Sequence, residues 1–182
     1  KGIDINKKEA TKYFKRASHD YDQQALIELG LFYKRSQSLQ KKNEELEKSK
    51  YLKKAFSTFR VLANKYRNAI GLREFALCLL DPAYQAILKE KDYQDYEDPS
   101  IPEHELPSDE KEKAIRMKGE KCLKIAADMG DDLAQFKFAS ILFSANKNES
   151  QTLQQMAMKY LKEAAKKGNE HARSKLNSLQ SA

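Results

Sequence analysis

Small and large apolar residues recur in a fixed order along the chain, in four stretches that begin at Ala10, Ala55, Gly119 and Ala157. In each stretch a large apolar residue follows four residues later, and then come a pair of mostly small residues and a turn position. A second small residue and a second large one follow the turn. Because residues three and four apart share one face of a helix, each stretch predicts a helix, a tight turn and a second helix.

The smallest side chains occupy equivalent positions in the four units. The small pairs are Ala17-Ser18, Leu62-Ala63, Ala126-Ala127 and Ala164-Ala165, and the small residues after the turn are Ala25, Gly71, Ala134 and Ala172. Small side chains let two helices approach to about 8 Å rather than 10 Å. We therefore expect these positions to mark helix crossings.

The turns are predicted most clearly in units three and four. Gly130 and Gly168 suit the left-handed position that ends a helix, and Asp131 and Asn169 can cap the helix that follows.

Units one and two depart from this pattern. Tyr21 and Tyr66 stand at the turn position in place of glycine, so the turn geometry there should differ. Leu62 replaces an alanine, and its larger side chain should push the two helices of unit two apart.

The pattern predicts helices near residues 6–19, 23–37, 43–65, 69–80, 83–90, 109–129, 132–146, 151–167 and 169–180. Residues 81–112 form an insertion between units two and three. Asp81 and Pro82 favour a short helix at its start. Pro99, Pro102 and Pro107, among many acidic residues, then indicate an extended or mobile loop.

The units resemble the Sel-one-like repeat (SLR) family, which is related to the tetratricopeptide (TPR) repeats. The resemblance is carried by "AMKYLKEAAKKGNEHARSKL" at 157–176 and by "ALIELGLFY" at 25–33. The opening "KGIDINKKEA" is similar to the loop that links repeats in that family, which implies that the sequence starts inside a longer array.

One helix pair cannot bury its own apolar face, so neighbouring pairs must stack. We therefore predict an all-α fold, a right-handed α-α superhelix of antiparallel helix pairs. Its units lie near 10–35, 55–80, 119–145 and 157–180. The polar last helix is expected to cap the array, and the chain is expected to be the C-terminal portion of a longer protein.

Charge is unevenly distributed along the 182 residues. The net charge is +7, but residues 92–112 carry nine acids and one lysine, which leaves +15 for the rest. A basic body can attract an acidic protein, a nucleic acid or an anionic membrane. Lysines that solvate the outer helix faces explain the same numbers.

The sequence offers no convincing catalytic or metal motif. It lacks a glycine-rich phosphate loop, and His104 lies between two glutamates in a charged loop, where solvation explains it better than a metal. We expect no enzyme activity and no cofactor.

Cys78 and Cys122 lie in apolar helical patterns and are expected to be buried free thiols, which favours a reducing, cytoplasmic compartment. No apolar run reaches the roughly 18 residues that a transmembrane helix needs, so we expect a soluble protein.

The second helix of each unit is expected to line the concave surface of the array and to bind a partner. Apolar residues would form a stripe there, with Lys34, Arg35 and Arg73 at its basic edges; the alternative is that several apolar members belong to the core between repeats. The candidate residues are Gln24, Ile27, Leu31, Lys34, Arg35, Ile70, Arg73, Leu77, Leu80, Phe136, Ser140 and Phe143.

The function expected from this arrangement is that of an adaptor or scaffold that holds a protein or peptide segment in the groove. The resemblance implies settings that include regulators and bacterial pathogen factors. The second hypothesis, based on the +15 outside the acidic loop, is a basic helical-repeat protein that binds RNA. A further hypothesis is that the acidic loop at 92–112 lies over the basic edge of the groove and inhibits partner binding.

Overall fold

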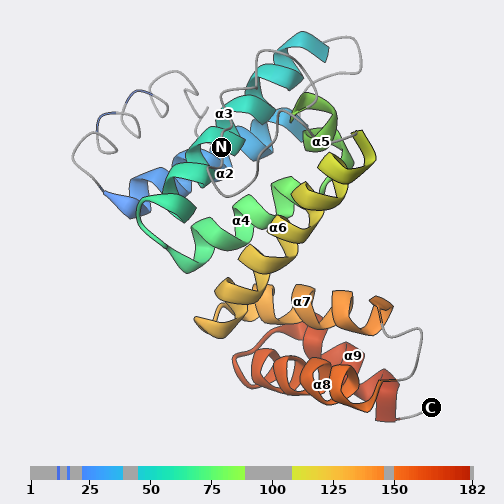
Figure 1. Cartoon of the computed structure of the whole chain (residues 1–182). Helices are drawn as coiled ribbons and strands as arrows, with labels where there is room; N and C mark the ends of the chain where they lie inside the picture. The colour runs from blue at the N-terminus through green and yellow to red at the C-terminus, as the bar shows by residue number, and fades with distance from the viewer. Residues whose placement is uncertain are drawn as a thin grey trace.

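The described part of the chain is entirely helical. The computed structural model describes residues 22–38, 45–88, 108–145 and 150–180, together with Lys12 and Arg16 (Figure 1). Within these ranges the helices are α2 (Gln23–Ser38), α3 (Glu45–Asn64), α4 (Ala69–Leu80), α5 (Pro82–Leu88), α6 (Ser108–Asp128), α7 (Asp132–Ala145), α8 (Gln151–Lys166) and α9 (Glu170–Gln180). The all-α prediction and the helices predicted from residue 23 onward are confirmed there. The helix predicted at 6–19 and the loop at 92–107 lie outside the described residues.

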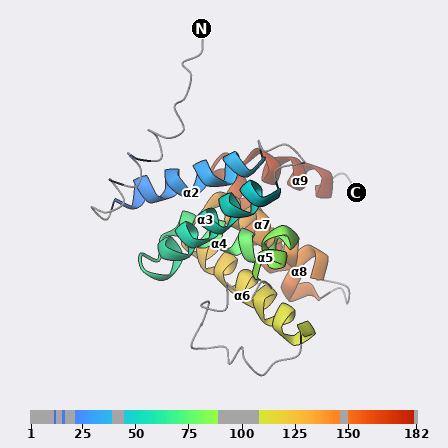
Figure 2. The same ribbon diagram turned by 90° about the horizontal axis from the view of Figure 1, so that it is seen from above.

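Helices pack mainly against their neighbours along the chain. α2 packs on α3, α3 on α4, α4 on α6, α6 on α7, α7 on α8 and α8 on α9, while the short α5 rests on α3 and α4. Figure 2 shows α2 and α9 on one side of the molecule, and α6 and α8 on the opposite side. Buried residues form a single cluster that extends from Leu26 in α2 to Ala172 in α9. The core is therefore a continuous seam between successive helices.

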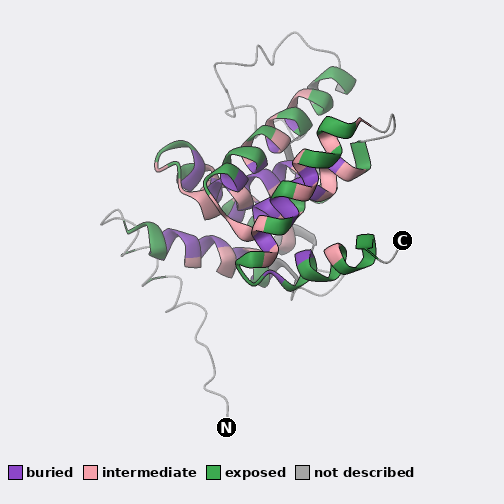
Figure 3. Cartoon of the chain, turned by 90° about the horizontal axis from the view of Figure 1, so that it is seen from below, coloured by how far each residue is buried: buried purple, intermediate pink, exposed green. Residues whose placement is uncertain are grey.

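The repeated positions form this seam. Large residues at equivalent places in three units are almost fully buried, and so are the small residues that precede and follow them. The buried members are Ala55, Phe59, Ala63, Gly119, Leu123, Ala126, Ala134, Ala157, Leu161, Ala164 and Ala172. Figure 3 shows that burial alternates with exposure along each helix and that α9 is largely exposed. Ala172 is the buried residue of α9, as its polar sequence predicts.

Glycines mark two further close contacts between helices. A Cβ atom at Gly30 of α2 would overlap the ring of Phe59 in α3. At Gly119 of α6 it would lie 3.0 Å from Cγ of Leu80 in α4. These glycines let a large side chain from the neighbouring helix pack against the backbone.

The turns of units three and four have the predicted geometry. Gly130 has φ of 92° and Gly168 has φ of 95°, both in the left-handed region. In unit three the backbone N–H of Gly130 donates to Ala127 O at 3.0 Å, and that of Asp131 donates to Ala126 O at 3.1 Å. This pair of hydrogen bonds is the Schellman motif, which satisfies the last carbonyls of α6. Unit four repeats it after α8.

The turn of unit two differs, as predicted from its lack of glycine. The left-handed residue is Arg67, with φ of 48°, and it follows Tyr66. The backbone N–H of Asn68 donates to Leu62 O at 3.1 Å and so reaches back one residue further than Asp131 does in unit three. The longer turn accommodates the extra residue of this unit. The turn at Tyr21 lies outside the described residues.

The expectation that Leu62 separates the helices of unit two is wrong. A Cβ atom at Gly71 would overlap Cβ of Leu62 and lie 3.0 Å from its carbonyl carbon. The backbones of α3 and α4 are therefore close at this crossing. Gly71 lacks the Cβ atom that alanine carries at the equivalent positions of units three and four, and this lets the backbone of α4 approach residue 62.

We predict that Gly71→Ala lowers the free energy of unfolding by about 1 kcal/mol or more, because overpacking costs more than the gain in helix propensity. The contact is with the Cβ atom of residue 62, which alanine would keep, so the test background is Leu62→Gly, where the same change should cost less. Denaturant unfolding of the four proteins of this double-mutant cycle measures the coupling. Equal effects of Gly71→Ala in both backgrounds would contradict a steric contact between residue 71 and the Cβ atom of residue 62.

Candidate partner-binding face

The second helices predicted for the units are α2, α4, α7 and α9, and we call their side of the molecule the second-helix face. Polar contacts join the N-terminal parts of these helices. Asn68 Nδ2 at the start of α4 donates to Gln23 Oε1 of α2 at 3.1 Å. Asn169 Nδ2 at the start of α9 donates to Asp132 Oδ2 of α7 at 2.9 Å. The starts of α2 and α4, and those of α7 and α9, therefore lie side by side.

Each second helix begins with an Asp or Asn cap, and two of the four were predicted. Asp131 Oδ1 accepts from the backbone N–H of Ala134 at 2.8 Å, and Asn169 Oδ1 accepts from that of Ala172 at 3.0 Å. The same type of cap is made by Asp22 for α2 and by Asn68 for α4. These caps satisfy the free amides of each helix start and fix where the residues that follow point.

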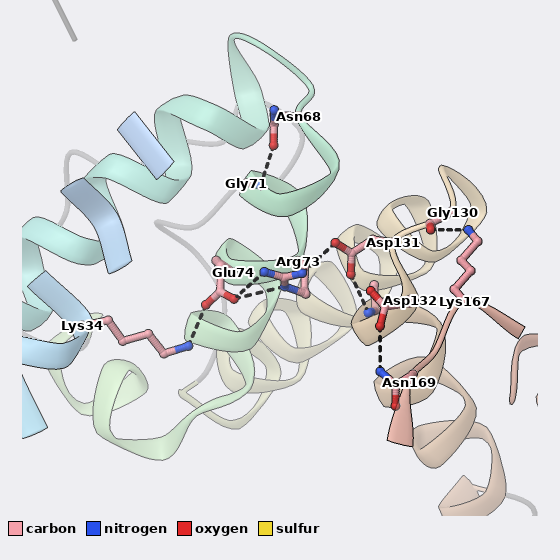
Figure 4. Close-up of polar contacts among 11 residues, drawn as sticks. Lys34, Asn68, Gly71, Arg73, Glu74, Gly130, Asp131, Asp132, Lys167 and Asn169 are labelled. Atoms are coloured by element: carbon pink, nitrogen blue, oxygen red, sulfur yellow. Dashed lines mark hydrogen bonds and ion pairs between the residues drawn. The ribbon is translucent and has the colours of Figure 1, made fainter. Parts of the chain in front are cut away.

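A chain of ion pairs crosses the second-helix face from α2 to the turn before α7 (Figure 4). Lys34 Nζ lies 2.6 Å from Glu74 Oε2, and Arg73 Nη2 lies 3.0 Å from Glu74 Oε1. Arg73 Nη1 lies 2.7 Å from Asp131 Oδ2. The side chains of Glu74 and Asp131 are only 5% and 7% exposed, so these pairs are shielded from solvent. The network therefore couples units one, two and three and neutralises both cations.

Two of the polar candidates, Lys34 and Arg73, take part in the ion-pair network, so these cations are not fully available to a partner. Lys34 is half-buried and Arg73 is 13% exposed, and both are engaged by Glu74. Gln24 is exposed, and its Nε2 donates to Glu28 Oε1 of the same helix at 3.2 Å. Arg35 is exposed.

The apolar candidates on α2 and α4 belong largely to the core. Ile27 is 4% exposed and lies in the same buried cluster as its neighbours on α2, so its assignment to an open groove is wrong. The apolar face of α2 is wider than one stripe. Leu80 lies over Gly119 and packs towards α6, so it too does not face a groove. Leu31 and Ile70 are partly buried against the core, and Leu77 is half-buried.

The second-helix face opens between α7 and α9. A groove of about 420 Å³ is lined there by Phe136, Ser140, Phe143 and Ser144 of α7 and by His171, Ser174, Lys175 and Ser178 of α9. The three candidates predicted on α7 all line it. The wall formed by α9 was not predicted from the sequence. Its lining residues recur at three- and four-residue intervals, which places them on one face of this polar helix.

Among the described residues, no cluster of three or more His, Cys, Asp or Glu side chains is placed to hold a metal ion. His104 lies outside the described ranges.

Cys78 is buried as predicted, and burial raises the pKa of its thiol to about 12, so it is un-ionised at neutral pH. Cys122, which was also predicted to be buried, is only half-buried. In the part of the chain that the structure covers, no helix combines the length and apolar character needed to cross a bilayer.

No protein-family model matches the chain, and no curated protein matches it at a significant level. The resemblance to SLR repeats is therefore an expectation from the residues themselves: the small pairs, the glycine turns and the spacing between them.

We predict that Glu74→Gln lowers the free energy of unfolding by about 2 kcal/mol, because the change leaves Lys34 and Arg73 facing a neutral, shielded amide. Chemical denaturation measures the loss. The matched control is Glu120→Gln, which breaks the exposed pair with Arg116 and should cost less than about 0.5 kcal/mol. Equal losses in the two variants would mean that the network contributes no more than a surface ion pair.

Proposed function

We propose that this protein is an adaptor that binds a segment of another protein along the second-helix face of a right-handed α-α superhelix of the SLR type. The observation that carries the proposal is the open groove between α7 and α9, where two phenylalanine rings are only partly buried. Exposed apolar groups rimmed by polar side chains are typical of interaction sites.

The order of helix packing supports the superhelix. Successive helices contact each other in sequence order, and the polar contacts at their starts align α2 with α4 and α7 with α9. Parallel alignment of every second helix is expected when antiparallel pairs stack in register. The placement of α2 and α9 on one side of the molecule is consistent with a stack that curves towards its second-helix face (Figure 2).

The distribution of side chains supports binding at one end of this face. On α2 and α4 the apolar candidates are packed and the cations are paired. On α7 and α9 the rings and polar side chains border a groove instead. Its volume is within the range of about 300–1,000 Å³ that is usual for ligand sites. It suits a few side chains of an extended segment.

The RNA hypothesis has a specific weakness on this face. Phosphate binding needs cations that are free to replace counterions. Lys34 and Arg73 already face Glu74 and Asp131, so the network provides little net positive charge. We expect no specific RNA complex. A filter-binding series at rising salt would reveal one as a steep linear fall in log affinity against log salt, and that result would favour RNA over a protein partner.

The proposed adaptor role predicts where a partner contacts the chain. A photo-crosslinking amino acid at Ser144, on the groove wall of α7, should yield a discrete crosslinked species in cells that produce the protein. The same residue at Lys162, on the exposed surface of α8, is the control and should not. Equal crosslinking from both positions, or crosslinking from Lys162 alone, would place the partner elsewhere and overturn the proposal.

A further inference from the structure

Building on the proposed function, we propose that the α7–α9 groove recognises a short acidic segment of the partner protein that carries an aromatic side chain. The shape, charge and hydrogen-bonding character of the groove each favour this chemistry.

The groove is closed at one end and open along its length. At the starts of the helices, Asn169 contacts Asp132, and the rings of Phe136 and His171 stack with centroids 5.6 Å apart. Beyond this closed end, α7 and α9 form opposite walls, each with residues spaced along a single helix face. An extended segment can therefore lie between the helices, with one side chain directed at the stacked rings.

The groove carries a positive charge from Lys175, and no Asp or Glu is among its lining residues. Lys137, beside the groove, adds a second cation, with Nζ 6.0 Å from the centroid of the Phe136 ring.

Two carboxylates lie at the starts of these helices. Glu170 is paired with Arg173 at 2.8 Å, and Asp132 accepts a hydrogen bond from Asn169 at 2.9 Å at the closed end of the groove. Among the described residues neither Lys175 nor Lys137 has an ion-pair partner. Carboxylates on a bound segment would supply the missing counter-charges.

The serine hydroxyls present acceptors to the groove. Ser140 Oγ donates to Phe136 O at 2.9 Å, and Ser144 Oγ donates to Ser140 O at 3.0 Å. Ser178 Oγ donates likewise to Lys175 O at 2.8 Å. Because these protons are used within their own helices, the oxygens offer lone pairs to the groove. Backbone N–H groups of an extended peptide are suitable donors for them.

The aromatic preference follows from Phe136 and Phe143, which lie seven residues apart on α7. Both rings are partly buried against the core and line the groove with their remaining surface. Aromatic side chains pack favourably against such rings in edge-to-face or offset geometry. Charge and aromatic character together distinguish this site from α2 and α4, where the cations are neutralised.

The test is selection of a random-peptide display library on the purified full chain. We expect enriched peptides to carry net negative charge and at least one aromatic residue. Ser174→Trp fills the groove, and Lys175→Glu reverses its charge; each should weaken binding of a selected peptide about ten-fold or more. Thr152→Trp and Lys166→Glu make the same changes on exposed positions of α8 and should leave binding unchanged.

An enriched pool without acidic bias, full binding to both groove variants, or no enrichment would each overturn the acidic-segment inference. The proposed adaptor function is judged separately by crosslinking from Ser144. If Ser144 captures a partner while selected peptides are neutral or basic, the adaptor role stands and the chemistry assigned to the groove is wrong.

Discussion

The structure depends on close contact between helices at positions where one side chain is small. At each crossing a small residue lets the neighbouring helix pack against the backbone, as Gly30 does for the Phe59 ring and Gly71 for Leu62. Such packing removes apolar surface from water without a wide helix separation, so successive helices can share a continuous core seam. The close approach of α3 and α4 depends on the missing Cβ atom at Gly71. What is constrained is the space between the two helix backbones at the crossing.

This seam leaves the second helices with two surfaces of different character. Towards α2 and α4, Glu74 joins Lys34 to Arg73, and Arg73 extends the network to Asp131 at the start of unit three. Charged groups are used there to hold units in register. Towards α7 and α9, the helices contact each other at their starts and border a groove along the rest of their length. The same face is therefore linked by charged side chains at one end and open at the other, where we propose that a partner binds.

The helices from residue 23 onward could be predicted because their ends are marked by local chemistry. Gly130 and Gly168 end one helix and Asp131 and Asn169 begin the next, and these signals act within a few residues. The groove was only half predictable. Phe136, Ser140 and Phe143 follow from the period of α7, but the opposite wall depends on how unit four stacks on unit three. Ile27 was misplaced because helical period alone does not reveal how wide the buried face of α2 is. The pairing of Glu74 with two cations likewise depends on tertiary packing.

The most direct measurement is a crystal structure of the chain bound to a peptide selected on it. The account predicts peptide density between α7 and α9, with an aromatic side chain against Phe136 and carboxylates near Lys175 and His171, on a stack whose second-helix face remains open. Density for the peptide on α3, α6 or α8 instead, or a closed bundle in which another helix fills the α7–α9 groove, would contradict it.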